Sequence, residues 1–428
     1  MLDRKFITEN SGAVQQNCIH RGVQVDVDRL VQIEVERRAQ QNEVQELNTQ
    51  ANANNKRIKQ AADSEQREAI IEEGRRLRER KDVAQAACDA LDAEAVGIQR
   101  LIPNLSHPDA PIGKDDKANL EISKGQHAPC QFSFKPLDHV ELGQRLDLFD
   151  FESAARTTGH GFYFLKNDAV LLDLSLQRYA LDLLIAEGFT PTITPDLARN
   201  EILEGVGFIP RGPETQIYSV ENSDLSLIAT AEITLGGLLS GQTLDAEDLP
   251  LRFVGMSHCY RTEAGAHGRA TRGLFRVHQF TKVEMFAFTL PDQSDAMLGR
   301  LRDLECRLFD GLEIPYRVVD TATGDLGGPA YRKFDLEAWM PGRGDDGEYA
   351  EVTSTSNCTD YQSRRLGIRY KTKGEKGTKF VHTLNGTAVA ISRAIIAVLE
   401  NHQQEDGSVL LPKALRTYMG KDRIVAKV

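Results

Sequence analysis

The most informative stretch of the chain covers residues 257–288 and reads SHCYRTEAGAHGRATRGLFRVHQFTKVEMFAF. It predicts one strand that ends at Arg261 and a second, with period-2 alternation, from Val277 to Phe288. The loop between them is rich in small and basic residues: Gly265, Gly268, Gly273, Arg269, Arg272 and Arg276. A loop of this length inside a compact domain is usually functional. We expect a hairpin that brings Arg261 and Glu284 over one face as a fixed cation and a fixed anion, with ordinary surface ion pairs as the alternative.

A second stretch, residues 383–404, reads TLNGTAVAISRAIIAVLENHQQ. It predicts a helix that Asn385 or Thr387 caps and whose next dozen positions are nearly all apolar, apart from Ser392 and Arg393. Such a helix must be largely buried, and an unpaired guanidinium there is costly. Arg393 therefore needs an anionic partner, either a carboxylate of the fold or a ligand phosphate, which an arginine fork suits.

Two further segments place hydroxyl and carboxyl side chains near expected strand ends. They are residues 227–235, LIATAEITL, and residues 347–365, GEYAEVTSTSNCTDYQSRR. The side chains concerned are Thr230, Glu232, Glu351, Ser354 and Thr355. Hard oxygen ligands of this kind are accepted by magnesium, although polar groups at strand ends often only satisfy the backbone.

An apolar repeat with alternating spacings of three and four runs from residue 30 to residue 102 and breaks at residues 61–66. Its members are Leu30, Ile33, Val44, Leu47, Ala51, Ile58, Ile70, Gly74, Leu77, Lys81, Ala84, Cys88, Leu91, Ala95, Ile98 and Ile102. It is interrupted at Arg37, Gln40 and Asn54. The pattern predicts an antiparallel coiled-coil hairpin over about residues 28–102, with helices of roughly 30 residues and 45 Å. Such an arm serves either as a dimerisation or spacer element or as a grip on a long partner.

The chain has 428 residues, 40% hydrophobic and 27% charged, which is typical of a soluble globular protein of two or three folded units. Its net charge is −11, so contact with RNA requires local basic patches such as the cationic run at residues 75–81. The segment IPNLSHPDAPIGKDD, residues 102–116, contains three prolines and predicts a linker. We therefore expect an arm domain over 1–105, a linker and start of the body over 106–150, and a main domain over 151–428.

The six cysteines lie far apart, without a CxxC pair or a zinc-ligand cluster. The sequence has no evident targeting or membrane segment, since its apolar run at residues 388–399 is too short to span a bilayer. We expect a cytoplasmic protein without zinc. Because helices and runs of strands do not alternate regularly, the fold class is α+β, with a mixed, mostly antiparallel sheet flanked by helices.

Together these segments resemble the seryl-tRNA synthetases of the bacterial and organellar type, from the first residues to nearly the last. The arm and its linker resemble the tRNA-binding domain of that family. The segment TPTITPDLARNEILEGVGFIP around Pro195 resembles class II motif 1, which builds the dimer interface. Residues 257–288 resemble motif 2 and residues 383–404 motif 3, and HCYRTEAG with TRGLFRVHQFTKVE is specific to this family.

The resemblance implies a homodimeric class II ligase that activates L-serine with ATP, in the presence of Mg²⁺, and transfers serine to the 3′ end of tRNA(Ser). It implies catalytic roles for Arg261, Glu284 and Arg393. It implies serine contacts at Thr230, Ala231, Glu232, Arg261, Glu284, Asn385 and Thr387. It implies ATP contacts at Arg261, Thr262, Glu263, Val277, Glu351, Val352, Thr353, Ser354 and Arg393, with Mg²⁺ held at Glu351 and Ser354.

These residue types suit the implied chemistry. The carboxylate of serine must attack the α-phosphorus of ATP, so a cation that touches both anions, Arg261, lowers the barrier. Positioning and electrostatics suffice, and no side-chain nucleophile is needed. The motifs differ from the residues usual in this family at Ala270, Thr234, Gly207, Phe208 and Ile209. None of these positions is among those expected to bind serine, ATP or Mg²⁺.

Two alternatives stay open at this point. One is a synthetase paralog used in antibiotic self-resistance or in aminoacyl transfer to a non-tRNA acceptor, although the intact arm argues against the latter. The other is a catalytically inactive RNA-binding or scaffolding protein, which the retained ATP and serine positions disfavour.

Overall fold

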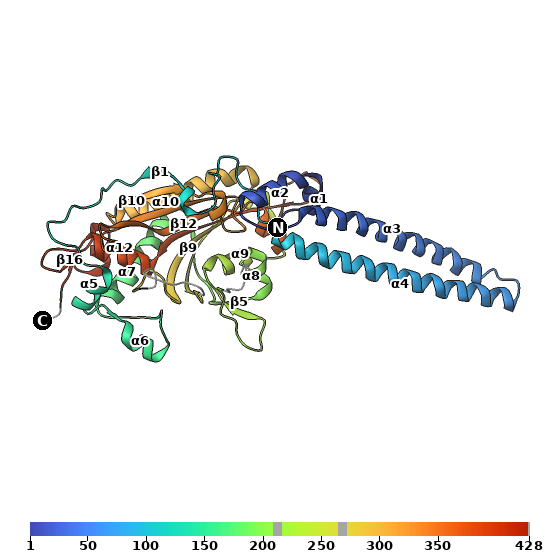
Figure 1. Ribbon diagram of the computed structural model, residues 1–428, viewed down its shortest axis with the longest axis horizontal. Coiled ribbons are helices and arrows are strands. Elements are labelled where there is room, and N and C mark those ends of the chain that lie inside the picture. Colours follow the sequence, from blue (N-terminus) through green and yellow to red (C-terminus); the bar gives the residue numbers. More distant parts are fainter. Residues whose placement is uncertain (209–215, 264–271, 427–428) are drawn as a thin grey trace. The chain divides into compact units, whose positions relative to one another are not determined.

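The structure is a computed structural model that describes residues 1–208, 216–263 and 272–426. The chain divides into two compact units, Met1–Leu105 and Ser106–Val428 (Figure 1). Several positions that the sequence singled out lie outside the described residues: Ile209, Gly265, Gly268, Arg269 and Ala270. In the described part of the chain, none of the helices combines the length and the apolar character that crossing a membrane requires.

The first unit is helical. Two short helices, α1 (Arg4–Glu9) and α2 (Ser11–His20), precede the long helices α3 (Val27–Ile58) and α4 (Ser64–Leu101), which lie side by side as an antiparallel hairpin (Figure 1). Carboxylates cap both long helices, because Asp26 accepts a hydrogen bond from the backbone of Arg29 and Asp63 from that of Gln66, each at 2.8 Å. The predicted coiled-coil hairpin is therefore confirmed.

One polar interruption of the apolar repeat turns out to belong to the seam between α3 and α4. Asn54 is buried, and its Nδ2 donates a hydrogen bond to the carbonyl oxygen of Ile70 at 2.8 Å. Gly74 faces it so closely that a Cβ there would lie 2.9 Å from Asn54 Nδ2. The amide and the glycine therefore interlock, which fixes the register of the two helices.

The second unit is built on an eight-stranded sheet of order β1-β10-β11-β12-β15-β9-β8-β4. Its strands are β1 (Leu120–Lys124), β4 (Thr190–Ile193), β8 (Leu251–Tyr260), β9 (Gln279–Thr289), β10 (Tyr316–Asp320), β11 (Arg332–Met340), β12 (Glu348–Asn357) and β15 (His382–Ala390). Neighbours are antiparallel except β4 and β8, which are parallel. The prediction of a mixed, mostly antiparallel sheet is confirmed. β4 is an edge strand, and its Pro191 carries no N–H.

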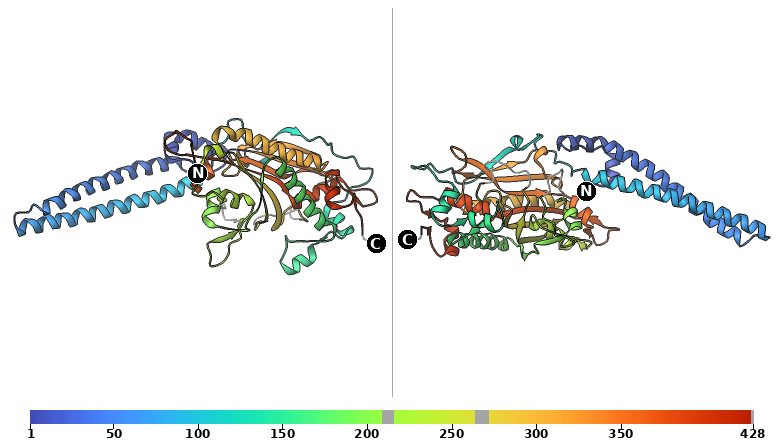
Figure 2. Two further views of the ribbon diagram at one scale, coloured as in Figure 1. Left: turned by 180° about the vertical axis from the view of Figure 1, so that it is seen from behind. Right: turned by 60° about the horizontal axis from the view of Figure 1, so that its bottom comes forward.

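Helices cover both faces of this sheet, but unequally. α7 (Asp168–Ala186), α10 (Ser294–Gly311) and α12 (Ile391–Asn401) pack on one face, where the gold helix α10 lies along the strands in Figure 2. Alternate residues of β9, such as Met285, point into this core. The opposite face has a smaller core around Phe286, with α8 (Asn200–Val206), α9 (Ala231–Gly237) and α11 (Tyr361–Leu366). The middle of that second face is left for polar side chains.

The remaining elements are short. They are α5 (His139–Arg145), β2 (Phe149–Asp150), α6 (Phe151–Thr157), β3 (Phe164–Leu165), β5 (Leu197–Arg199), β6 (Leu225–Leu227), β7 (Thr243–Asp245), β13 (Arg369–Lys371), β14 (Lys379–Phe380), β16 (Val409–Leu410), α13 (Lys413–Met419) and β17 (Arg423–Ile424). Single 3₁₀ turns occur at Asp116–Ala118, Ala246–Asp248, Pro291–Gln293 and Thr323–Asp325.

The prediction that Asn385 or Thr387 caps a helix is wrong. Both residues lie on strand β15, where Thr387 pairs with Glu284 of β9, and helix α12 begins only at Ile391. The apolar run extends across the end of the strand and into the helix. Periodicity alone does not separate a short buried strand from a buried helix, and here the pairing with β9 decides.

Candidate active site

Arg261 follows directly on β8 and lines a small cavity of about 80 Å³ between β9, β12 and the start of α12. Its guanidinium stacks on Phe280, with Cζ 5.3 Å from the ring centroid, and its Nε donates to the carbonyl oxygen of Ala229 at 3.4 Å. No carboxylate of the described residues forms an ion pair with it. The guanidinium is therefore held in place by an aromatic ring and is available to bind an anion that enters the cavity.

Arg393 lies in the first turn of α12 and lines the same cavity. Its Nη1 donates to the carbonyl oxygen of Glu351 at 2.8 Å and lies 3.6 Å from Glu351 Oε1. Its Cζ is 4.7 Å from the centroid of Phe275. Burial lowers the pKa of Arg393, while Glu351 opposes that effect. A carboxylate of the fold thus neighbours this guanidinium, but a loose ion pair leaves it able to bind a further anion.

A β-bulge at Val352 brings Glu351 and Ser354 to the same side of β12. On β11, Leu336 pairs with Thr353 and the next residue, Glu337, pairs with Glu351, so Val352 is the extra residue. Without this bulge, two positions three apart on a strand would face opposite sides of the sheet. Burial raises the pKa of Glu351, but Arg393 and Lys333 outweigh it and hold the pKa below its ordinary value.

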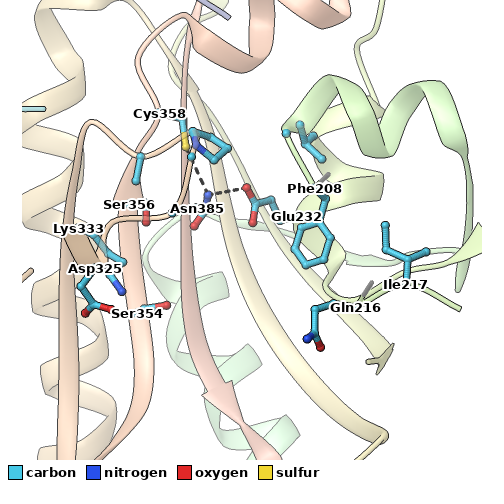
Figure 3. Close-up of a pocket in the computed structure, with 16 residues that line it drawn as sticks. Phe208, Gln216, Ile217, Glu232, Asp325, Lys333, Ser354, Ser356, Cys358 and Asn385 are labelled. Carbon is cyan, nitrogen blue, oxygen red and sulfur yellow. Dashed lines mark hydrogen bonds between the residues drawn. The ribbon is translucent and has the colours of Figure 1, made fainter. Parts of the chain in front are cut away.

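A second cavity, of about 590 Å³, adjoins the first at Ser354, which lines both (Figure 3). Glu232, in the first turn of α9, faces it; Figure 3 shows Asn385 beside it. Oε1 of Glu232 accepts hydrogen bonds from Gln362 Nε2 at 2.7 Å and from Asn385 Nδ2 at 2.8 Å. Burial, and then the charge of Glu284, raise the pKa of Glu232 to about 7. This carboxyl is suited to receive a cationic group of a ligand.

Glu284 is buried in the sheet beside the first cavity. Its Oε2 forms an ion pair with Lys282 Nζ at 2.6 Å and accepts a hydrogen bond from Thr387 Oγ1 at 3.2 Å. Lys282 and Thr387 line the cavity, whereas Glu284 lies behind them. The fixed anion expected at Glu284 is thus partly neutralised by Lys282 in this structure.

The structure gathers most of the candidate site residues around these two cavities. The first is lined by Arg261, Glu263, Val277, Glu351, Val352, Thr353, Ser354, Thr387 and Arg393, and the second by Glu232, Ser354 and Asn385. Four candidates line neither cavity: Thr230, Ala231, Thr262 and Glu284. Thr230 caps α9, since its Oγ1 accepts a hydrogen bond from the backbone of Glu232 at 3.3 Å.

Sequence reasoning missed several residues of the site: Phe275, Lys282, Lys333 and Gln362. A signal existed for Lys282, which lies two positions before Glu284 on a predicted strand and must therefore share its face. No comparable signal existed for Gln362, because α11 comes to the site only through the tertiary fold.

The donor set offers a partial metal site at most. The Glu351 carboxylate and the Ser354 hydroxyl line one cavity wall and are hard oxygen ligands. Within residues 1–208, 216–263 and 272–426, no three His, Cys, Asp or Glu side chains gather in a way that could hold a metal ion. A cation bound here would need further oxygen ligands from a bound anion, as magnesium commonly takes from phosphates.

The mostly antiparallel sheet, with an arginine site beside two of its strands and a buried helix that begins at that site, defines a class II aminoacyl-tRNA synthetase core. Residues 217–402 match the family model for the tRNA synthetase class II core domain (G, H, P, S and T), and residues 1–106 match the model for the seryl-tRNA synthetase N-terminal domain. The chain belongs to the seryl-tRNA synthetase family.

Known proteins agree with this assignment over the full length of the chain. It is 60% identical over 422 residues to the serine–tRNA ligase of Rhodopirellula baltica, with 99% of each chain covered. Its fold matches the seryl-tRNA synthetase of Pyrococcus horikoshii complexed with ATP, with a TM-score of 0.92, 39% identity and full coverage of both chains. It also matches the cytoplasmic serine–tRNA ligase of Naegleria fowleri in complex with AMP, with a TM-score of 0.86, 30% identity and coverage of 98% and 96%. The family resemblance inferred from the motifs is confirmed.

Proposed function

We propose that this protein activates L-serine with ATP to form seryl-adenylate and then transfers the seryl group to the 3′ end of tRNA(Ser). The observation that carries the proposal is the guanidinium of Arg261, which forms no ion pair with a carboxylate of the described residues and stacks on Phe280 in the cavity that joins the Glu232 pocket at Ser354. A cation in this position can touch the serine carboxylate and the α-phosphate together, which lowers their repulsion as the new bond forms.

In this proposal the first cavity, which at about 80 Å³ is too small for a whole nucleotide, takes the phosphates of ATP, and the second takes serine. ATP binds where Arg261 and Arg393 supply cations, with Glu263, Val277 and the bulged segment 351–354 along the nucleotide, and with Thr262 behind it. Serine binds beside Glu232, whose carboxylate receives the ammonium group, with Asn385 and Thr387 next to it. Thr230, Ala231 and Glu284 support the serine site from behind, since they line neither cavity.

Mg²⁺ is proposed to bind together with ATP. Glu351 and Ser354 would hold it, because the bulge at Val352 puts both side chains on one cavity wall. The ion would neutralise negative charge on the polyphosphate. The chain's own contribution is to orient the nucleotide with Arg261 and Arg393.

A homodimer through the motif 1 region around Pro195 is also proposed. Ile193 on β4 is 81% exposed, and Leu174 on α7 is 57% exposed. Val170 and Leu171 on α7 are exposed as well. Large apolar side chains gathered on neighbouring elements are typical of a protein-protein interface. We further propose a cytoplasmic location, since no disulfide bond joins any of the six cysteines, all of which lie in the described part of the chain.

The test is ATP-pyrophosphate exchange with the purified protein, run separately with serine, threonine, alanine and glycine. We expect exchange with serine to be at least 100-fold above that with alanine or glycine, because hydroxyl-binding groups reject ligands that leave them unpaired. Threonine should also be rejected, because the site must lack room for its methyl group. Folded protein without serine-dependent exchange would refute the proposal. Exchange without charging of tRNA(Ser) would instead favour transfer to a non-tRNA acceptor.

A further inference from the structure

One buried histidine lies outside both cavities yet touches the loop that forms the nucleotide site. His139 is the first residue of α5, and its ring contacts Gly273 and Leu274, where the arginine-rich loop returns toward β9. We propose that His139, in its neutral form and oriented by Glu400, is a positioning residue that fixes this limb of the loop for adenylate formation. The inference rests on the proposed function and assigns a role to a residue outside the three motifs.

The hydrogen-bond partners of His139 define which ring nitrogen carries the proton. The backbone N–H of Leu274 points at Nε2 at 3.2 Å, and since a backbone N–H only donates, Nε2 must accept. Nδ1 lies 2.9 Å from Oε1 of Glu400, so Nδ1 carries the hydrogen and donates it to the carboxylate. The imidazole is thereby a neutral bridge from a carboxylate to the loop backbone.

Glu400 makes this bridge rigid. Its carboxylate also accepts hydrogen bonds from the backbone N–H groups of His139 at 3.0 Å and Gly342 at 2.9 Å, and its side chain is 2% exposed. Glu400 lies in the last turn of α12, the helix whose first turn carries Arg393. The bridge therefore links the loop to the helix that bears the second phosphate-binding candidate.

Two independent contacts show how closely the loop is seated on α5. Gly273 has a φ of +73°, and a Cβ at this position would lie 2.1 Å from Nε2 of His139 and 2.7 Å from Cγ2 of Val140. Only glycine allows this approach. In addition, Arg272 Nη1 forms an ion pair with Asp138 Oδ2 at 2.8 Å. Ordering of the limb thus depends on α5 at three successive loop residues.

The residues that follow the anchored amide form a wall of the nucleotide cavity. Phe275 is enclosed by two guanidinium groups, since Cζ of Arg393 and of Arg343 lie 4.7 and 4.4 Å from its centroid. Val277 lines the same cavity, and Arg276 lies 3.6 Å from Glu263. Loss of the Leu274 contact would shift this wall.

Protonation of His139 would break the anchor, because a second ring N–H would then oppose the N–H of Leu274. Glu400 on α12 touches the ring. Among the described residues, the other charged groups around it are Asp138, the N-cap of α5, Glu141 on α5, Arg272 on the loop, Arg343 between β11 and β12, and Glu348 at the start of β12. The hydrogen bond from Leu274 therefore needs the neutral ring.

The first experiment compares His139→Leu with His402→Leu. His402 is a partly buried histidine two positions after Glu400, and its Nε2 bonds the carbonyl oxygen of Leu312 rather than the loop. We expect kcat/KM for ATP in serine-dependent exchange to fall about 10-fold or more in the His139 variant and less than 2-fold in the control, because an unpaired buried amide is costly. Equal losses in the two variants would overturn the proposal.

The second experiment uses His139→Gln, whose side-chain oxygen can accept the Leu274 hydrogen bond. We expect this variant to recover most of the activity lost in His139→Leu, with kcat/KM for ATP at least 5-fold above that of the leucine variant. Equal losses in the glutamine and leucine variants would show that the hydrogen bond to Leu274 does not control the loop.

Hydrogen exchange of the peptide that covers residues 272–277 separates this inference from the proposed function, because the contact needs no substrate. Faster amide exchange in His139→Leu than in wild type and His402→Leu supports the anchor, even if the wild type lacks serine-dependent activity and the proposed function fails. Unchanged amide exchange in an active enzyme overturns the anchor and leaves the proposed function standing.

Discussion

At the scale of single residues, the most informative side chain is that of Arg261, which has no ion-pair partner among the described residues. Its guanidinium is held by an aromatic ring and a carbonyl oxygen, and no carboxylate of the described residues neutralises it. Such a cation costs little to reorganise when an anion arrives, which is the arrangement that electrostatic catalysis requires.

Replacing Arg261 with alanine should therefore reduce serine-dependent exchange by about 100-fold or more, which corresponds to about 2.7 kcal/mol of transition-state stabilisation. Arg252 provides a matched control, since it lies on β8, the strand that Arg261 follows, and stacks on Phe189 at 5.7 Å. Arg252→Ala should leave the exchange rate within about 3-fold, and both variants should be compared by exchange kinetics and thermal unfolding. Near-normal exchange in Arg261→Ala would show that its role is misassigned.

The carboxyl of Glu232 makes folding stability depend on pH. Its pKa rises from 4.5 to about 7 on folding, through burial and the charge of Glu284. The folded state holds this proton more tightly, so the contribution to the free energy of unfolding is greatest below pH 4.5 and decreases as the pH rises to 7.

Glu232→Gln removes this dependence. We expect the free energy of unfolding of the wild type, relative to the variant, to fall by about 2 kcal/mol between pH 5 and pH 8. Urea titrations at several pH values measure it. Other titrating groups, such as Asp335, are common to both proteins and cancel in the difference. Parallel curves for the two proteins would contradict the assigned shift.

At the scale of elements, the arm offers a sharp test of packing. Alanine normally stabilises a helix relative to glycine by about 0.8–1.0 kcal/mol. At Gly74 of α4, however, a Cβ would lie 2.9 Å from Asn54 Nδ2, whereas at Gly97 of the same helix nothing lies within 4 Å. Gly97→Ala should slow amide exchange in α4 and Gly74→Ala should not. Equal slowing in the two variants would show that the side chain of Asn54 can move aside at little energetic cost.

The arm should also be separable from the chemistry of activation. Replacing residues 41–83 with a four-residue glycine-rich turn removes the outer part of the hairpin and keeps α1, α2 and the helix ends. We expect serine-dependent exchange within about 2-fold of the wild type and a loss of tRNA charging of at least 100-fold, because the contacts with the RNA backbone are lost. Unimpaired charging would mean that the arm does not provide the contacts that bind the tRNA.

The elements also show where sequence reasoning succeeds and where it stops. The hairpin α3–α4 and the strands β8 and β9 follow from periodicities of 3.5 and 2, which local side-chain geometry dictates. The start of α12 was misplaced because the apolar run crosses from β15 into the helix without a change of composition. The bulge at Val352 leaves no trace in composition, since only the pairing with β11 defines it.

At the scale of the whole molecule, the exposed apolar residues of α7 and β4 form the proposed dimer interface. Ile193→Asp should place a charge in the proposed interface, so that the protein sediments as one chain rather than two in analytical ultracentrifugation. Ile112→Asp is the control, because Ile112 is 69% exposed but belongs to neither element. A dimer that persists in Ile193→Asp would place the interface elsewhere.

An open sheet has two edge strands, and β4 is one of them. Free strand edges invite aggregation, since any extended segment of another chain can add to them. Pro191 withholds one of the few amide donors that this four-residue strand possesses. This edge is therefore a poorer template for an added strand, and a dimer built on the proposed interface would depend on side-chain packing more than on pairing of backbones.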